Sequence, residues 1–355
     1  MLERYLVTGC AGFIASKVSE LLLEAGHLVV GVDNLNDAYD PRLKQWRLAR
    51  LQQRAGFRFH QTDITDRLAL EQLFRADVDS PEADELQRRP YSAVVNLAAR
   101  AGVRPSVENP QLYYQTNCDG TLSLLEMCRQ FGVEKFLLAS TSSLYGGHNP
   151  VPYREDADTN RPLSPYAASK KAAETLAFTY HHLHGLDVSI PRYFTVYGPA
   201  GRPDMSVFRF VRRIAEGEPI IVFGDGQQSR DFTYVDDIAR GTVAALRPLG
   251  YEVFNLGGDR PVKLASVIEQ IVELTGKQAR IEYRPAHPAD VPATWADIGK
   301  ANELLRWSPQ VAIEEGLRQS VAWYRENRET ALPLELGDCP DFLAEKMGLS
   351  PSPEE

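Results

Sequence analysis

Short apolar segments alternate with longer amphipathic segments along the first half of the chain. The apolar segments have the length of β-strands and span residues 2–7, 28–32, 93–98, 136–139 and 188–190. Segments with helical spacing of apolar positions span residues 13–25, 112–130 and 166–184. This alternation predicts an α/β fold, a doubly wound parallel sheet covered by helices on both faces. Because proline lacks the amide proton that a central strand needs, we expect the strand at 188–190 to end before Pro191.

The pattern loosens after about residue 192, where shorter elements are separated by connections rich in proline and glycine. We therefore expect residues 1–191 to form one domain and residues 192–330 a smaller C-terminal domain, with the chain crossing between the two. The polar segment 77–90 is typical of a surface insertion. The proline-rich tail 331–355 ends in acidic residues, and we expect part of it to be mobile.

Composition narrows the range of partners. The formal net charge is −9, which argues against a nucleic-acid surface, so an anionic ligand would have to be held by individual arginines. No apolar segment reaches the ~18 residues of a membrane helix, and the first residues do not resemble a signal peptide. The four cysteines, Cys10, Cys118, Cys128 and Cys339, show no metal-binding spacing. We expect a reduced, cytoplasmic protein without a structural metal.

A glycine motif, Gly9-x-x-Gly12, stands between the first strand and the first helix. Glycines at such a turn let the backbone approach a pyrophosphate, which then lies against the amides at the start of the helix near Phe13. Asp33 ends the next strand, 21 residues after Gly12, where a carboxylate can bond both ribose hydroxyls and repel a 2′-phosphate. An ordinary glycine turn is the alternative. The strand, helix and Asp33 together favour a Rossmann-type fold that binds NAD rather than NADP.

A second motif combines Tyr166 with Lys170. The helix that carries them is expected to begin at the N-cap Ser164, with Pro165 in its first position. Residues four apart share one helix face, and an adjacent ammonium stabilises a phenolate, so Tyr166 is a candidate proton acceptor. A Tyr-x-x-x-Lys pair also arises by chance. The hydroxyl-rich segment 140–146 follows an apolar strand and is therefore expected at the ligand-binding edge of the sheet.

Several motifs together carry a resemblance to a known family. They are Gly9-x-x-Gly12, Asp63-Ile64, the segments 96–99 and 141–146, Tyr166-x-x-x-Lys170, and the segments 192–199 and 230–237. From about residue 4 to 328 the chain resembles the extended short-chain dehydrogenase/reductase family. Within it, the chain is most similar to nucleotide-sugar epimerases that act at C4 of UDP-glucuronate. Ala15, Asn96, Pro191 and the 77–90 insertion depart from the family pattern.

The resemblance implies a site between the two domains. Tyr166, Lys170 and Thr141 would be catalytic, with Lys170 lowering the pKa of Tyr166. NAD would be held by Gly9, Gly12, Phe13, Ile14, Asp33, Asn34, Asp63, Ile64, Leu97, Ala98, Ala99, Tyr166, Lys170 and Tyr193. The UDP-sugar would be bound in the C-terminal domain and by Thr141, Ser142, Ser143, Tyr166, Thr195, Arg202 and Arg230, with Arg104 and Asp290 as further candidates. The family also implies a homodimer made by helices 112–130 and 166–184, packed as a four-helix bundle.

Two details favour an acid sugar as the substrate. Related dehydratases and decarboxylases usually carry Asp or Glu directly after the first hydroxyl residue of the strand-end motif, whereas Ser142 and Ser143 follow Thr141 here. Thr195 stands where epimerases of UDP-galactose type usually have asparagine. Short hydroxyls could hold a carboxylate and so restrain a 4-keto uronate from losing CO₂. A UDP-glucose 4-epimerase and a non-catalytic NAD-binding sensor or scaffold remain the alternatives.

Overall fold

The computed structural model describes residues 2–78, 90–286 and 290–337. Within these ranges eight parallel strands form one sheet, in the order β11-β7-β5-β4-β1-β2-β3 with β6 beside β7. The strands are β1 (Arg4–Thr8), β2 (Leu28–Asp33), β3 (Phe57–Gln61), β4 (Ala93–Asn96), β5 (Lys135–Leu138), β6 (Ser140–Thr141), β7 (Asp187–Tyr193) and β11 (Tyr251–Leu256). The doubly wound Rossmann-type fold is thereby confirmed.

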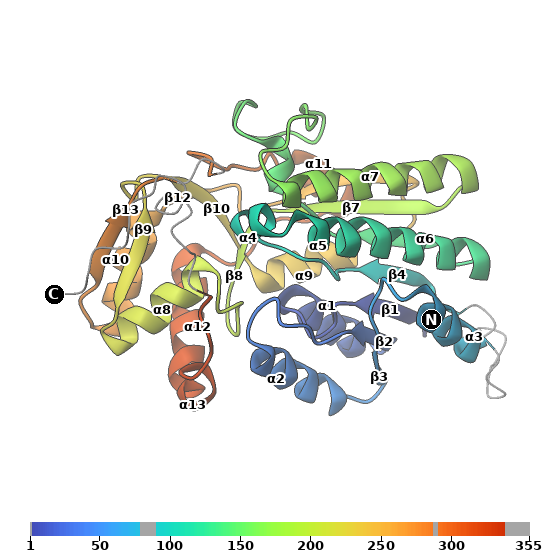
Figure 1. The fold of residues 1–355 in the computed structure, drawn as a ribbon, viewed down its shortest axis with the longest axis horizontal. Coiled ribbons are helices and arrows are strands. Elements are labelled where there is room, and N and C mark those ends of the chain that lie inside the picture. The colour runs from blue at the N-terminus through green and yellow to red at the C-terminus, as the bar shows by residue number, and fades with distance from the viewer. Residues whose placement is uncertain (1, 79–89, 287–289, 338–355) are drawn as a thin grey trace.

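Helices cover both faces of this sheet (Figure 1). One face packs against α3 (Arg67–Val78), α6 (Gly120–Phe131) and α7 (Pro165–His184), and the other packs against α1 (Phe13–Glu24), α9 (Val235–Ala244) and α11 (Gly299–Leu305). Strand β1 shows why both faces need cover. Leu6 is buried against the helices of the first face, whereas Tyr5 and Val7 are buried against those of the second. Alternate residues of a strand point to opposite faces, so an uninterrupted apolar strand requires cover on both.

The second half of the chain adds a smaller unit beside the sheet (Figure 1). Its described strands are β8 (Thr195–Tyr197), β9 (Pro219–Phe223), β10 (Ser229–Tyr234), β12 (Pro261–Lys263) and β13 (Arg280–Arg284), arranged as β12-β10-β8 and β13-β9. Its helices are α8 (Ser206–Glu216), α10 (Leu264–Thr275), α12 (Ile313–Glu326) and α13 (Arg328–Ala331). Strand β11 returns to the large sheet between two parts of this unit. The boundary at residue 191 stays a prediction.

The remaining elements surround the ligand-binding edge. They are α2 (Pro41–Gln52), α4 (Val103–Glu108), α5 (Pro110–Tyr114), the π-helical turn η2 (Gln115–Asp119) and the 3₁₀ turn η3 (Ser142–Tyr145). The helix predicted over 112–130 is thus α5, η2 and α6 in succession. In the described part of the chain, no helix is long and apolar enough to cross a membrane.

The prediction that a strand ends before Pro191 is wrong. Strand β7 continues through Pro191 to Tyr193. The amide of Asp187 faces β5 and donates to the carbonyl of Glu134, just before that strand. The amide of Val188 faces β11 and donates to the carbonyl of Gly250, just before that strand. Because amide direction alternates along a strand, the position of Pro191 faces β5's side. It falls opposite the gap between β5, which ends at residue 138, and β6, which begins at residue 140, so no ladder bond is lost.

The predicted insertion begins later than expected. Asp77 belongs to α3 and is buried, where it accepts a hydrogen bond from the hydroxyl of Tyr91 (2.6 Å) and pairs with Arg58 (3.1 Å). The polar pattern therefore concealed the last turn of a helix. Residues 79–89 lie outside the described residues.

The start of the predicted tail is packed. Ala331, Leu334 and Leu336 are buried, and the amide of Glu335 bonds to Asp40 at the start of α2 (2.8 Å). Residues 338–355, where mobility was expected, lie outside the described residues.

Candidate active site

A cavity of about 460 Å³ opens where the carboxyl ends of the sheet strands face the smaller unit. Ligands of open α/β sheets bind at these ends, at the point where the strand order reverses, which here is between β1 and β4. Every residue predicted above for NAD or substrate lines this cavity except Arg104. The structure thus brings together side chains from Gly9 to Asp290 in a single space.

The glycine loop fits a dinucleotide. Gly9 has φ +68°, and a Cβ there would lie 2.9 Å from the backbone of Ala98. A Cβ at Gly12 would lie 2.8 Å from the carbonyl oxygen of Gly9. Helix α1 begins directly after Gly12 without a side-chain cap, so its first amides are available to an anion. A cradle that a single Cβ would fill is what the backbone needs in order to approach a pyrophosphate.

Two of the carboxylates that line the cavity lie at the end of β2 and just after the end of β3. Asp33 ends β2, where its Oδ2 accepts from the amide of Ala11 (3.1 Å) and its Oδ1 from that of Leu35 (2.8 Å). A carboxylate has about four acceptor positions, so Asp33 keeps capacity for ribose hydroxyls. Asp63 accepts from Asn34 Nδ2 (2.6 Å) and from Thr65. Burial opposes ionisation, but these hydrogen bonds outweigh it and lower the pKa of Asp63.

Lys44 is a cavity residue that the sequence reasoning missed. It is buried on α2, and its Nζ donates to Asn36 Oδ1 (2.8 Å). Burial lowers its pKa to about 8; the charge of Asp33 opposes this, and nearby arginines add to it. No motif singled out in the sequence includes it.

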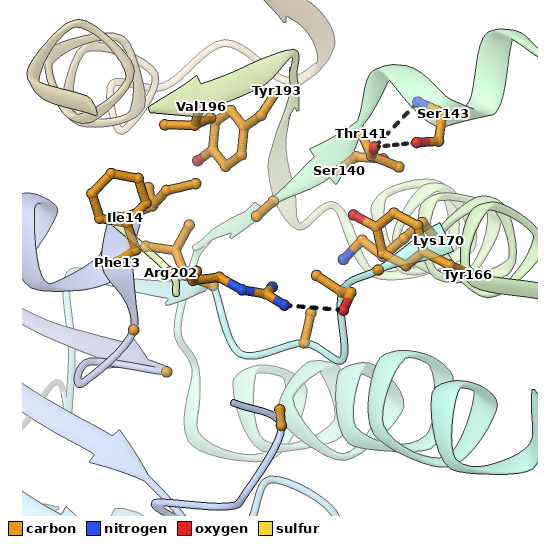
Figure 2. A pocket seen from close by; sticks show the side chains of 18 of the residues that line it. Phe13, Ile14, Ser140, Thr141, Ser143, Tyr166, Lys170, Tyr193, Val196 and Arg202 are labelled. Atoms are coloured by element: carbon orange, nitrogen blue, oxygen red, sulfur yellow. Dashed lines mark hydrogen bonds between the residues drawn. The ribbon is translucent and has the colours of Figure 1, made fainter. Parts of the chain in front are cut away.

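Tyr166 and Lys170 enter the cavity from the first turns of α7. Ser164 caps this helix by accepting from the amide of Ala167 (3.2 Å), and Pro165 follows, which confirms the predicted start. Figure 2 shows both side chains pointing into the space that Phe13 and Ile14 border on the opposite side. The positions are one helical turn apart on one face, as their spacing predicted.

Burial shifts the pKa of both members of this pair. Burial raises the pKa of Tyr166, while a hydrogen bond with Thr141 and the charge of Arg202 act in the opposite direction. Burial lowers the pKa of Lys170 to about 8, opposed by the charge of Glu174. Burial thus raises the pKa of Tyr166, and the charge of Arg202 opposes this. The lowering of that pKa by Lys170 stays a prediction.

Hydroxyl groups gather beside Tyr166. Thr141 ends β6, and its Oγ1 accepts from the amide of Ser143 and lies 3.1 Å from the Ser143 hydroxyl (Figure 2). Ser142 and Thr195 line the same cavity. The carboxylates that line it are Asp33, Asp63 and Asp290, and the two residues that follow Thr141 in the chain are serines. This end of the site offers several neutral donors to an anion.

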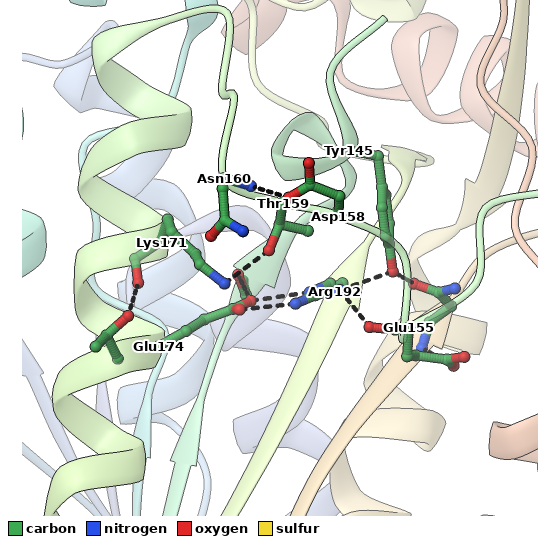
Figure 3. A network of polar contacts seen from close by, with 11 residues as sticks. Tyr145, Glu155, Asp158, Thr159, Asn160, Lys171, Glu174 and Arg192 are labelled. Atoms are coloured by element: carbon green, nitrogen blue, oxygen red, sulfur yellow. Dashed lines mark hydrogen bonds and ion pairs between the residues drawn. The ribbon is translucent and has the colours of Figure 1, made fainter. Parts of the chain in front are cut away.

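A buried network holds α7 against the strand ends (Figure 3). Glu174 follows Lys170 by one turn and accepts two hydrogen bonds from Arg192 of β7 (3.0 and 2.8 Å) and one from Ser140 (2.6 Å). Arg192 also donates to the hydroxyl of Tyr145 (3.0 Å), which donates to Asn255 of β11 (2.6 Å). Sequence reasoning missed Glu174, although its spacing of four from Lys170 was a usable signal.

The arginines predicted for substrate divide into two groups. Arg202 and Arg230 line the cavity. Arg202 binds Asp204 through two hydrogen bonds (3.0 and 2.5 Å), and Arg230 bonds to the carbonyl of Ser229 (2.9 Å). Arg104 is not among the residues that line the cavity, and its role towards the substrate stays a prediction. It pairs with Asp290 (2.7 Å), and its guanidinium stacks on the ring of Phe223 at 3.8 Å, so its side chain is directed at the smaller unit.

Comparison with known proteins identifies the family. The model of a family described as GDP-mannose 4,6 dehydratase matches residues 6–320. A UDP-glucuronate 4-epimerase of Thermodesulfobacterium geofontis is 56% identical over 326 residues, which cover 92% of this chain and 97% of that protein. The chain belongs to the extended short-chain dehydrogenase/reductase family.

Two solved members of this family show the same fold. UDP-glucuronic acid 4-epimerase from Bacillus cereus, in complex with UDP-glucuronic acid and NAD, is 36% identical with a TM-score of 0.82, covering 91% of this chain and 99% of that one. UDP-glucose 4-epimerase from Thermotoga maritima, with UDP-glucose, is 34% identical with a TM-score of 0.81, covering 92% and 99%. This short-chain dehydrogenase/reductase is thus similar to epimerases of both acid and neutral sugars.

The described residues contain no cluster of three His, Cys, Asp or Glu side chains that could hold a metal ion.

Proposed function

We propose that this protein is an NAD-dependent 4-epimerase that interconverts UDP-glucuronate and UDP-galacturonate. The observation that carries the proposal is the single cavity, which joins a dinucleotide cradle to Tyr166, Thr141 and a group of hydroxyl donors. The 56% identity to a UDP-glucuronate 4-epimerase supports the same assignment.

The residues present fit NAD. The loop from Gly9 to Phe13 would receive its pyrophosphate, Asp33 its adenosine ribose and Asp63 its adenine, while Lys170 would bond the nicotinamide ribose. NAD supplies a reversible hydride acceptor for C4 of the sugar. The protein's task is to place that carbon, to exclude water and to move one proton.

Tyr166 would move this proton. Its hydroxyl, hydrogen-bonded with Thr141, would accept the proton of the sugar 4-hydroxyl and later return it. Since burial raises the pKa of Tyr166, positive charge must favour its ionised form, and the charge of Arg202 acts in this direction. Lys170, one helical turn away on the same face, would add to this effect as the family resemblance implies. The 4-keto sugar would turn over about its diphosphate link and present its other face for reduction. Hydride would then return to C4 on that face as Tyr166 returns the proton to O4, which gives the opposite configuration at C4.

The hydroxyl donors explain why an acid sugar would survive this chemistry. A 4-keto uronate is a β-keto acid and loses CO₂ readily when the bond to its carboxylate stands perpendicular to the ketone. Thr141, Ser142, Ser143 and Thr195 would hold the carboxylate in plane through charge-assisted hydrogen bonds. Ser142 and Ser143 follow Thr141, so the position at which related dehydratases usually carry their additional acid holds a hydroxyl group here.

The substrate's diphosphate would be bound by arginines. Arg202 and Arg230 line the cavity from the smaller unit, and guanidinium groups match phosphate geometry. Asp290 lines it as well, whereas Arg104 would act through its ion pair with Asp290.

A side-by-side incubation tests the assignment. Purified protein is given UDP-glucuronate or UDP-glucose, and the products are identified by NMR. We expect UDP-galacturonate to form from the first at a higher kcat/KM than UDP-galactose from the second. Faster turnover of UDP-glucose would favour the neutral-sugar alternative, which the likeness to the Thermotoga maritima enzyme supports. If neither product forms, the result would favour a non-catalytic NAD-binding protein.

We also propose a homodimer built by α7 and by the α5–α6 region. Large apolar side chains on these helices are exposed, among them Tyr114, Leu122, Phe178 and Leu183. Paired across a twofold axis, the helices would form a four-helix bundle. A monomeric mass by light scattering at micromolar concentration would contradict this. The three described cysteines, Cys10, Cys118 and Cys128, are free and buried, which fits the reducing cytoplasm that we infer as the location.

A further inference from the structure

Arg47 joins three segments that are distant in the sequence. It is buried on α2, and its Nη1 donates to the carbonyl of Ala11 in the glycine loop (3.1 Å) and to the hydroxyl of Tyr39 (2.8 Å). Its Nε and Nη2 both donate to the carbonyl of Ala200 (3.2 and 2.6 Å). One guanidinium therefore links the first turn of the sheet to the connection between β8 and α8.

The carbonyl held by this fork belongs to a residue in an uncommon conformation. Ala200 has φ +52°, in the left-handed region that residues with a Cβ rarely adopt. Such a conformation persists only where its surroundings fix it. Ala200 is buried, and two hydrogen bonds from a rigid guanidinium are the strongest polar contacts that hold its carbonyl.

The segment that contains Ala200 leads directly to the cavity. Two residues further on, Arg202 lines the cavity and lies between Asp204 and the carbonyl of Ala101. At Gly201 a Cβ would lie 3.8 Å from the ring of Phe13, which follows the glycine loop. The residue after the glycine loop and the segment 198–202 thus lie beside each other, and Arg47 bonds to both the loop and the segment.

Arg47 also carries a buried charge. Within the described ranges no carboxylate lies within ion-pair distance of it, and all its acceptors are neutral. A buried charge is costly unless it is compensated. Arg47 bonds to the glycine loop, where the diphosphate of NAD would lie under the proposed function, so its charge would add to the positive potential there.

We propose that Arg47 is a positioning residue that fixes the glycine loop and the segment 198–202 in one arrangement, by holding Ala200 in its left-handed conformation. This rests on the proposed function, which places NAD at the glycine loop and the diphosphate of the UDP-sugar at Arg202. The geometry requires the planar fork of arginine, because two N–H groups converge on one carbonyl. A lysine keeps the charge but supplies no such fork.

The first test replaces Arg47 by lysine, with Arg50→Lys as the matched control, since Arg50 lies on the same helix and is exposed. We expect Arg47→Lys to raise KM for UDP-glucuronate about tenfold and the Kd of UDP, measured by calorimetry, by a similar factor. The kcat should stay within threefold of the original, and Arg50→Lys should change neither constant. Unchanged KM and Kd in Arg47→Lys would overturn the proposal.

The second test asks whether Arg47 acts through Ala200. Glycine adopts φ +52° without strain, so Ala200→Gly should remove most of the need for the fork. In the Ala200→Gly background, the tenfold effect of Arg47→Lys should shrink to threefold or less. An undiminished tenfold effect would show that the two residues act independently and would overturn the proposal.

Two arrangements keep the test decisive. If Arg47→Lys does not fold, Ala200→Val serves instead, because a β-branched residue is strained at positive φ. We expect Ala200→Val to raise the Kd of UDP at least threefold. An unchanged Kd would overturn the proposal. If the unaltered protein does not turn over UDP-glucuronate, the proposed function fails, but the Kd of UDP and the fraction of protein that retains NAD still decide the role of Arg47. Arg47→Lys should keep that fraction near its original value because the charge remains.

Discussion

Replacing Thr195 by alanine should divert part of the turnover from epimerisation to decarboxylation. Thr195 lies on β8 and lines the same cavity as Thr141 and Ser143. Its backbone pairs with Phe232 of β10, a contact that alanine preserves. Among the described residues its hydroxyl has no hydrogen-bond partner, so the substitution breaks no bond within the protein. The change therefore removes one ligand-directed donor and little else.

The expected magnitude follows from the charge of the acceptor. A hydrogen bond to a charged group contributes about 1.5–3 kcal/mol, which corresponds to a tenfold to hundredfold change in the population of carboxylate held in plane. We expect kcat for epimerisation of UDP-glucuronate to fall, and the ratio of 4-keto-pentose and CO₂ to UDP-galacturonate to rise by roughly this factor. UDP-glucose has no carboxylate, so its turnover should change less.

The assay follows both products by NMR in one incubation, with Thr195→Ser as the matched variant. Serine keeps the hydroxyl and should restore the original product ratio. Equal losses on both sugars, without decarboxylated product, would show that Thr195 only shapes the cavity. The argument for an acid sugar would then rest on similarity alone.

Three further substitutions or conditions test the rest of the site. Tyr166→Phe should abolish epimerisation while leaving the retained NAD, measured by absorbance after denaturation, unchanged; appreciable turnover would refute its role in proton transfer. Because burial lowers the pKa of Lys170 to about 8, kcat should fall above pH 8 as its ammonium is lost, and a flat profile to pH 10 would contradict this. This loss of activity should not come from unfolding. Between pH 8 and 10.5 Lys170 is neutral in the folded protein and charged in the unfolded chain, so its contribution to the free energy of unfolding grows as the pH rises. Glu174→Gln leaves Arg192 buried without its counter-charge and should lower the free energy of unfolding by about 3–5 kcal/mol in denaturant titrations, whereas a change below 1 kcal/mol would show that the pair is dispensable.

Features with local causes were predictable from the sequence. The turn at Gly9 and Gly12 needs backbone without a Cβ, and the start of α7 follows from Ser164 and Pro165, each of which acts within one helical turn. Asp33 follows Gly12 by the number of residues typical of this motif, and Tyr166 and Lys170 lie in the first turns of the helix that Ser164 and Pro165 begin. Their shared position at the strand ends then follows from the parallel sheet.

Features that depend on distant contacts were not predictable. Strand β7 passes through Pro191 because β5 ends and β6 begins opposite it, which only the assembled sheet shows. Arg47 bonds to Ala200, 153 positions away, and nothing in the local sequence of α2 distinguishes it from Arg50. Arg104 is a cationic candidate by similarity, but its stacking on Phe223 and pairing with Asp290 are set by the smaller unit.

The fate of the hydrogen at C4 tests the central claim most directly. The protein, without added NAD, is incubated with UDP-glucuronate deuterated at C4 in ordinary water, and the product is examined by NMR and mass spectrometry. If the hydrogen leaves C4 and returns to it within one enclosed site, UDP-galacturonate will keep the deuterium at C4 during repeated turnover. Replacement of the deuterium by solvent hydrogen, or failure to form UDP-galacturonate, would contradict the account.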